Sequence, residues 1–179
     1  MTAPAHRRPP PIEVVCNTGP IIALSRIGRL DLLRQIIPSI RVPSIVVGEL
    51  KDGFGKADLN VSGWLETIVI QDSSSLPDAF LSAELDAGEA AVITLAKELN
   101  IGVLMDERKG RRVAAEAYGL MVIGTGRILL EAKNRRLIGQ IRPLVEQMRA
   151  GGYYLSERLM RNLCREAGEL DETVRDKAY

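Results

Sequence analysis

Four oxygen-bearing side chains, each from a separate segment of the chain, are the strongest candidates for chemistry: Asn17, Glu49, Glu89 and Asp106. Carboxylates that are brought together repel one another and raise one another's pKa unless a cation lies between them. Hard divalent cations such as Mg²⁺ and Mn²⁺ prefer oxygen ligands of this kind. If the four side chains meet, the sequence predicts a Mg²⁺ or Mn²⁺ site that activates a water molecule for hydrolysis.

The rest of the reactive inventory favours the same route. The single histidine, His6, lies in a proline-rich N-terminal stretch. A Ser-His-Asp or Cys-His nucleophile system therefore lacks its base. Cys16 and Cys164 are far apart and belong to no metal-ligand motif, which argues against a disulfide scaffold and against a zinc site.

The elements that carry the four residues alternate between strand and helix. Strands are predicted at Ile12–Cys16, Ile40–Val42, Trp64–Ile70, Gly102–Met105 and Met121–Ile123, with loops at Lys51–Asn60 and Ser73–Pro77. Helices are predicted at Ile21–Ile27, Leu30–Ile36, Ser44–Leu50, Leu85–Leu99, Lys109–Tyr118, Ile128–Lys133, Ile141–Arg149 and Ser156–Ala167. The alternation predicts a parallel sheet with helices on both faces. Ligands bind beyond the carboxyl ends of such strands, where we expect all four residues to lie.

Each residue also has a purely structural interpretation. Glu89 and the nearby Asp86 favour the positive N-terminus of their helix. Asp106 is placed to cap the helix that follows it. Glu49 fits a solvated helix position, and Asn17 with Thr18 fits a plain turn and helix cap. Only the joint placement of the four residues favours a functional site.

Composition and charge limit the function classes. The chain has 179 residues, enough for one domain, and with 4% aromatic residues its core must be aliphatic. Without an apolar signal segment or a membrane-length run, we predict a cytoplasmic protein with no membrane association. Between Glu107 and Arg142 nine Lys/Arg and three acidic residues give +6 (9 − 3), against +1 for the whole chain. Such a region fits either a polyanion partner or a solvated helix surface.

Several motifs, in order, resemble the DUF3368 group of PIN-like proteins over residues 12–169. They comprise Val14 to Leu24 (VVCNTGPIIAL), Ile27 to Leu33 (IGRLDLL), Val42-Pro43 through Glu49-Leu50, Leu85 to Ala90 (LDAGEA), Met105-Asp106-Glu107-Arg108 with Gly110 to Ala114 (GRRVA), and Ala167-Gly168-Glu169. The resemblance implies a three-layer α/β/α PIN-like domain with a central parallel sheet and extra C-terminal helices. Independently of the resemblance, the Pro-, Ala- and Arg-rich residues 1–11 predict a disordered arm, and residues 170–179 are predicted to be a flexible tail.

The resemblance also implies a function and a set of roles. PIN-like proteins are often Mg²⁺- or Mn²⁺-dependent ribonucleases, many of them toxins of type II toxin–antitoxin pairs and homodimers. Asn17, Glu49, Glu89 and Asp106 would occupy the catalytic and metal-binding positions, with Thr18 as the hydroxyl beside the first. We therefore predict an endoribonuclease with RNA, a cognate antitoxin and a second copy as partners. Lys109, Arg111 and Arg112, which follow Asp106 directly, would hold the flanking phosphates.

One departure from the family pattern leaves an alternative open. PIN nucleases usually carry Asp at the first position, where this chain has Asn17, which can ligate a metal but brings no charge. Asp86 or Glu107 would have to supply the missing charge. The alternative is a catalytically weak or inactive PIN-like module that binds nucleic acid or protein. A receiver-like phosphoacceptor domain is a weaker third hypothesis, because Gly124-Thr125-Gly126 and no lysine follow the last strand.

The predicted C-terminal helix carries an apolar face formed by Leu155, Leu159, Leu163 and Cys164. Such a face usually packs on its own domain. A dimer contact or an antitoxin-binding surface is the other interpretation.

Overall fold

The computed structural model describes residues 10–54 and 59–169, which are built around a sheet of five parallel strands. The strands are β1 (Glu13–Cys16), β2 (Ser39–Val42), β3 (Val69–Ile70), β4 (Gly102–Leu104) and β5 (Val122–Ile123). Their order is β3-β2-β1-β4-β5. The central strand β1 is flanked on both sides, with Val15 paired to Arg41 of β2 and to Val103 of β4. The strand order reverses between β1 and β4, which is where a parallel sheet opens a crevice for ligands.

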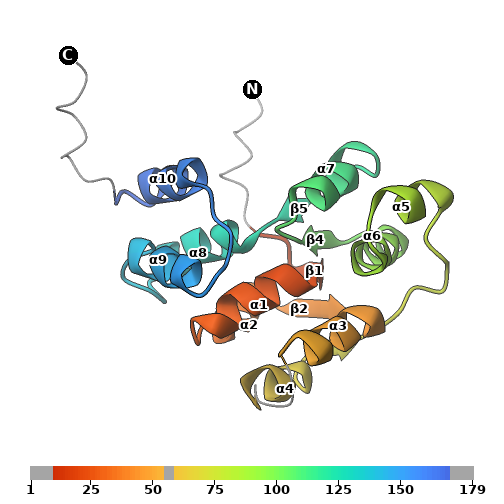
Figure 1. Ribbon diagram of the computed structural model, residues 1–179, viewed down its shortest axis with the longest axis horizontal. Helices are drawn as coiled ribbons and strands as arrows, with labels where there is room; N and C mark the ends of the chain where they lie inside the picture. The colour runs from red at the N-terminus through yellow and green to blue at the C-terminus, as the bar shows by residue number, and fades with distance from the viewer. Residues whose placement is uncertain (1–9, 55–58, 170–179) are drawn as a thin grey trace.

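Helices make up most of the rest of the described chain. They are α1 (Thr18–Arg26), α2 (Asp31–Ile36), α3 (Ser44–Phe54), α4 (Leu59–Leu65), α5 (Ala79–Glu84), α6 (Ala87–Leu99), α7 (Arg108–Glu116), α8 (Thr125–Asn134), α9 (Arg142–Ala150) and α10 (Glu157–Glu166). Figure 1 shows α1 to α4 on one side of the sheet and α5 to α7 on the other. This is the three-layer α/β/α arrangement predicted from the alternation of elements.

The three C-terminal helices extend one of the outer layers. Helix α8 packs against α1 and α2, α9 packs against α1, and α10 packs against α8 and α9. The apolar face of α10 is largely used inside the domain, since Leu163 and Cys164 are buried. Leu155, just before the helix, is buried too, whereas Leu159 is 48% exposed. Most of this face therefore packs on its own domain.

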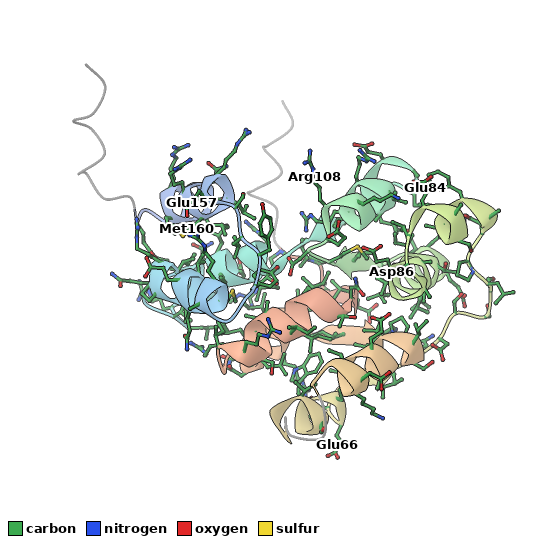
Figure 2. All side chains as sticks on the ribbon, viewed as in Figure 1. Glu66, Glu84, Asp86, Arg108, Glu157 and Met160 are labelled. Carbon is green, nitrogen blue, oxygen red and sulfur yellow. The ribbon has the colours of Figure 1, made fainter. Side chains whose placement is uncertain are left out.

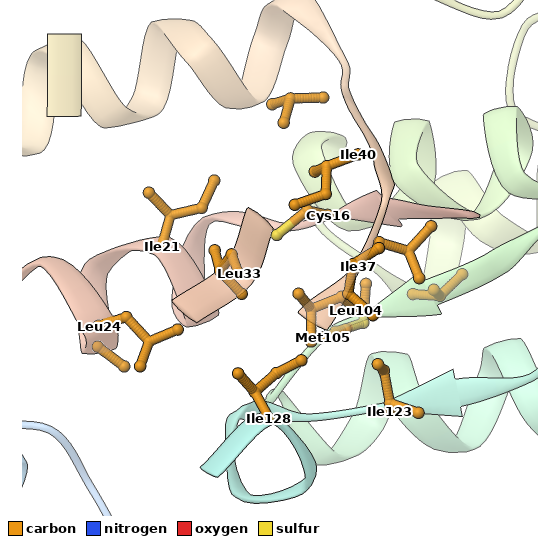
Figure 3. Packing of buried hydrophobic residues seen from close by; sticks show 14 of the residues in the cluster. Cys16, Ile21, Leu24, Leu33, Ile37, Ile40, Leu104, Met105, Ile123 and Ile128 are labelled. Carbon is orange, nitrogen blue, oxygen red and sulfur yellow. The ribbon is translucent and has the colours of Figure 1, made fainter. Parts of the chain in front are cut away.

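The core is aliphatic, as the shortage of aromatic residues predicts. Figure 3 shows Cys16 and Leu104 from the two central strands packed with Ile21 and Leu33 from the helices that follow β1. All four side chains are fully buried. Burial of such side chains stabilises a fold by about 1.5–3 kcal/mol each relative to exposure. The carboxyl ends of β1 and β4 are therefore fixed on a rigid base.

The strand predicted at Trp64–Ile70 is wrong over most of its length. Helix α4 runs to Leu65, and only Val69 and Ile70 pair with β2. Val61, Trp64 and Leu65 are all buried, and their spacing of three and four residues is that of one helix face. The loop predicted at Lys51–Asn60 is likewise replaced by the ends of α3 and α4, apart from residues 55–58, which lie outside the described chain.

Several helix boundaries differ from the prediction. Helix α1 begins at Thr18 instead of Ile21, a start that is compatible with Pro20 because proline is tolerated in the first turn of a helix. Helix α6 begins at Ala87 instead of Leu85, because the side chain of Asp86 accepts a hydrogen bond from the backbone of Glu89 as its N-cap. The short helix α5 was not predicted, although Asp78 caps it in the same way.

The predicted arm at 1–11 and tail at 170–179 fall mainly on residues outside the described ranges, so they stay predictions. Within those ranges, no helix has the length and apolar character needed to cross a bilayer.

Candidate functional site

Asn17 and Asp106 lie at the ends of neighbouring strands. The backbone N–H of Asn17 donates to the carbonyl of Leu104 at 2.9 Å, which continues the pairing of β1 with β4 by one residue. Asn17 is 9% exposed, and Asp106 follows directly after Met105, which is fully buried. The rigid core beneath both residues therefore holds their backbones side by side.

Glu49 reaches the same region from helix α3. The hydroxyl of Thr18 donates to Glu49 Oε2 at 2.6 Å and, more weakly, to Asn17 Oδ1 at 3.4 Å. The carboxylate lies against α6 at Gly88, where a Cβ atom would stand 2.5 Å from Glu49 Oε1. Thr18 therefore orients the carboxylate and links the start of α1 to the middle of α3.

Glu89 is the buried acid of the group, with 6% of its surface exposed. Its Oε1 atom has no hydrogen-bond partner among the described residues. Burial raises the pKa of its carboxyl, and the negative charges of Asp86 and Glu107 raise it further. A buried carboxylate oxygen without a donor costs free energy, and a bound cation is one way to offset that cost.

Asp106 is held by two residues that the sequence interpretation missed. Thr125, at the start of α8, donates to it twice, from the backbone N–H at 2.8 Å and from the hydroxyl at 2.6 Å. Tyr153 also makes a side-chain hydrogen bond to Asp106, and burial, followed by the charge of Asp106, raises the pKa of the tyrosine. A threonine that follows a strand and opens a helix was a usable signal, whereas nothing in the sequence pointed to Tyr153.

Glycines make room for each of the three carboxylates. The Glu49 carboxylate lies where a Cβ of Gly88 would point, that of Glu89 where a Cβ of Gly110 would point, and that of Asp106 where a Cβ of Gly124 would point. Each glycine is on a neighbouring element and lacks the side chain that would fill this space. The close approach of these elements to the carboxylates explains three glycines by contact with the site.

The predicted metal-site residues and Thr18 line one cavity of about 700 Å³, whereas Lys109, Arg111 and Arg112 do not. Its acidic wall is formed by Asn17, Thr18, Glu49, Asp86, Glu89, Asp106 and Glu107. Asp86 and Glu107 also serve as helix N-caps, since Asp86 accepts from the backbone of Glu89 and Glu107 from that of Lys109. The cap of α7 is Glu107, so Asp106 does not have the α7-capping role considered for it.

The side chains do not form a closed ligand shell in this conformation. Among the described residues, no three carboxylate, thiol or imidazole groups converge as metal ligands do. The donor set nevertheless fits a hard divalent cation, because it consists of oxygens alone and includes the unpartnered, buried Oε1 of Glu89.

The four basic residues at the start of α7 have different surroundings. Arg108 lines the cavity, and Arg112 is exposed. Lys109 forms an ion pair with Glu84 at 3.1 Å. Arg111 donates to the carbonyl of Met105 at 2.7 Å, so its guanidinium braces the loop after β4. In Figure 2, Arg108 lies on the side of α7 that faces α10, whereas Glu84 and Asp86 lie on the side of α5 and α6.

The comparison with known families agrees with this geometry. No curated protein matches the chain. The model of the DUF3368 family, which is described as a PIN domain, matches residues 13–169. PIN domains have a nuclease-like fold and generally use divalent metals. With its five-stranded parallel sheet and its acids at the strand ends, the chain belongs to the DUF3368 family of PIN-domain proteins.

Proposed function

We propose that the protein is a Mg²⁺- or Mn²⁺-dependent endoribonuclease. One observation carries this proposal: the buried Oε1 of Glu89 lacks a hydrogen-bond partner in the described chain, and Glu89 lines the same cavity as Glu49 and Asp106. A site that only stabilised the fold would satisfy such an atom with a donor. The PIN-domain membership supports nucleic acid as the substrate.

Each residue has a role in this proposal. Glu49, Glu89 and Asp106 hold the cation, Asn17 is a neutral ligand, and Asp86 and Glu107 add negative charge nearby. When bound, the cation supplies a water of lowered pKa and offsets charge on the phosphate. Thr18 and Thr125 orient Glu49 and Asp106 through hydrogen bonds of 2.6 Å.

Substrate positioning is assigned to the basic residues of α7. Arg112 is exposed and free to contact phosphates that flank the scissile bond, and Lys109 contributes once RNA competes with Glu84. Arg111 acts through the loop that carries Asp106, because its guanidinium already donates to Met105. This is a positioning role and not the phosphate contact predicted from the sequence.

Partners follow from the family resemblance. We propose that the protein is the toxin of a type II toxin–antitoxin pair, that it forms a homodimer and that a cognate antitoxin binds it in the cytoplasm. The face of α10 offers little support for either protein contact, because Leu163 and Cys164 are already buried within the chain.

The test is Mn²⁺ binding by calorimetry, with RNA cleavage assayed on the same samples. Asp106→Ala is compared with wild type and with Glu66→Ala, an exposed acid far from the cavity in Figure 2. We expect micromolar binding and cleavage in wild type and Glu66→Ala, and the loss of both in Asp106→Ala. Absence of binding and cleavage at millimolar metal would refute the nuclease proposal.

A second candidate function is favoured by the contacts of the carboxylates themselves. Glu49 and Asp106 are already satisfied by Thr18 and Thr125, and the neutral Asn17 stands at the first position. These features suit a PIN-like module that binds RNA or protein without chemistry. Asn17→Asp separates the two candidates: cleavage that appears or rises strongly favours the inactive module, and cleavage that changes little favours the nuclease.

A further inference from the structure

The cavity has a second wall that the proposed nuclease function does not use. Opposite the carboxylates it is lined by apolar and aromatic residues from α8 to α10 and from the segment between α9 and α10. Leu129, Met148, Leu155 and Leu163 are all buried and form its floor. The two tyrosines of the segment between α9 and α10, Tyr153 and Tyr154, line the cavity above them.

The two tyrosines are used in opposite ways. Tyr153 turns inward to Asp106 and is half-buried. Tyr154 is 89% exposed and, within the described residues, makes neither a side-chain hydrogen bond nor a ring contact. Aromatic residues amount to only 4% of the chain, so an exposed aromatic ring that lines this cavity without an internal contact is unusual. An exposed ring beside an apolar floor is a surface on which a flat ligand stacks.

The rim of the cavity carries positive charge. Arg108 lines it from α7 and has no acidic partner in the described part of the chain. The flat ligand that suits Tyr154 therefore also has an anionic backbone. Arg108 and the carboxylates border the same cavity, so this backbone would pass over the proposed cation site.

We propose that Tyr154 and the apolar floor bind a nucleobase of single-stranded RNA, while Arg108 contacts the adjacent backbone phosphate. This inference rests on the proposed function and names the residues of this chain that would contact the base and its phosphate. A base in single-stranded RNA is free to leave its neighbours and stack on an aromatic ring, whereas a base inside an A-form duplex is not. A cavity of about 700 Å³ is in the size range of small-ligand sites, and the subsite is tolerant of sequence because every base has a π-face.

The experiment measures RNA binding by fluorescence anisotropy in EDTA, so that hydrolysis does not enter. The probes are a ten-nucleotide oligouridine, the same strand with abasic central nucleotides, and an RNA hairpin. The variants are Tyr154→Ala and Tyr154→Phe, with Phe80→Ala as the control because Phe80 is 50% exposed but does not line the cavity. Unfolding curves of each variant check the fold, which the exposed position of Tyr154 should leave unchanged.

Tyr154→Ala should bind oligouridine roughly 5- to 30-fold more weakly, while Tyr154→Phe and Phe80→Ala stay within about twofold of wild type. Wild type should bind the abasic strand more weakly than oligouridine by a similar factor. Tyr154→Ala should bind the two strands with nearly equal affinity. The hairpin should bind wild type more weakly than oligouridine does. Arg108→Gln should lower the salt slope of log K by about 0.7, the value for one phosphate contact.

Two results would overturn the inference: equal affinity of Tyr154→Ala and wild type for oligouridine, or no RNA binding by wild type. A protein ligand in this groove would produce the first result. Mn²⁺ binding and cleavage are measured separately and report on the proposed function. If wild type cleaves RNA but Tyr154→Ala binds oligouridine as tightly as wild type does, the subsite is refuted and the nuclease is not. Affinity that depends on Tyr154 without any metal binding refutes the nuclease alone.

Discussion

Replacing Gly88 by alanine should damage the candidate site without unfolding the protein. Gly88 lies in the first turn of α6, and an alanine Cβ there would stand 2.5 Å from Glu49 Oε1. Ordinary contacts begin at 3.4 Å, so the carboxylate must move by about 0.9 Å (3.4 − 2.5). Glu49 is not buried and its side chain is flexible, so it can make this movement. The site therefore changes while the backbone stays in place.

The two opposing contributions to stability nearly cancel. Alanine in place of a helical glycine stabilises a helix by about 0.5–1 kcal/mol. Loss of the hydrogen bond from Thr18 to Glu49 costs about 0.5–1.5 kcal/mol. We therefore expect a free energy of unfolding within about 1 kcal/mol of wild type. Function is more sensitive, because a displacement of about 1 Å can reduce the rate of a reaction about 100-fold.

The assay combines Mn²⁺ calorimetry, RNA cleavage and urea unfolding. Gly48→Ala is the matched control, since Gly48 is also a helical glycine, lies next to Glu49 and has no neighbouring atom within 4 Å of the place that a Cβ would take. We expect Gly88→Ala to weaken Mn²⁺ binding at least about tenfold and to slow cleavage about 10- to 100-fold. Gly48→Ala should change neither.

Two results would refute this reasoning. Mn²⁺ affinity of Gly88→Ala close to that of wild type would mean that the position of Glu49 does not matter for the metal. A loss of several kcal/mol of stability would mean that the clash is not relieved by the side chain. Gly110→Ala is the reference for such a loss of stability, because its Cβ would clash with the buried Met105. The overpacked core should cost about 1–3 kcal/mol of stability.

Three other predictions concern charge and hydroxyl contacts. Burial, and then the charge of Asp86, raise the pKa of Glu89. In EDTA, the free energy of unfolding of wild type should therefore fall as the pH rises from the ordinary pKa of a glutamate to the raised one. Glu89→Gln should lack this fall, which urea midpoints measured across pH would show. Thr125→Val should destabilise the fold by about 1–3 kcal/mol, measured by urea unfolding, by leaving one oxygen of Asp106 without its hydroxyl donor, whereas Thr125→Ser should cost less. Arg112→Gln should weaken RNA binding with unchanged stability, whereas Arg111→Gln, with the same change of charge, should lower stability; anisotropy and urea unfolding distinguish the two.

Sequence reasoning succeeded where a local pattern also fixes the tertiary position. Asn17 and Asp106 each follow an apolar strand, and parallel strands bring their carboxyl ends to one edge. Glu49 and Glu89 needed the further assumption that their helices start at that edge, and both line the same cavity as the other two. The prediction failed at Trp64–Ile70, where a run rich in β-branched residues outweighed a helical spacing of buried positions.

The contacts around the acids were harder to predict than the acids themselves, because they join elements far apart in the chain. Thr125 reaches Asp106 from α8, and Tyr153 reaches it from the segment after α9. Thr125 follows β5, the strand beside β4, so its position after a strand was a usable signal. No local signal encodes the packing of α9 on α1, after which the chain reaches Tyr153. Arg111 was misjudged for the same reason, since charge alone does not show that a guanidinium is bound to a backbone carbonyl.

The charge balance of the cavity argues most directly for a bound cation. Within the described residues, Glu49, Glu89 and Asp106 form no ion pair, and hydroxyl and backbone donors alone satisfy Glu49 and Asp106. Of the nearby cations, Lys109 pairs with Glu84 and Arg111 with a carbonyl, whereas Arg108 lines the cavity and forms no ion pair with a described residue. Neutral donors orient carboxylates but do not offset their mutual repulsion. In the proposed function, a hard divalent cation beside the unpartnered oxygen of Glu89 would supply compensating charge in a small space.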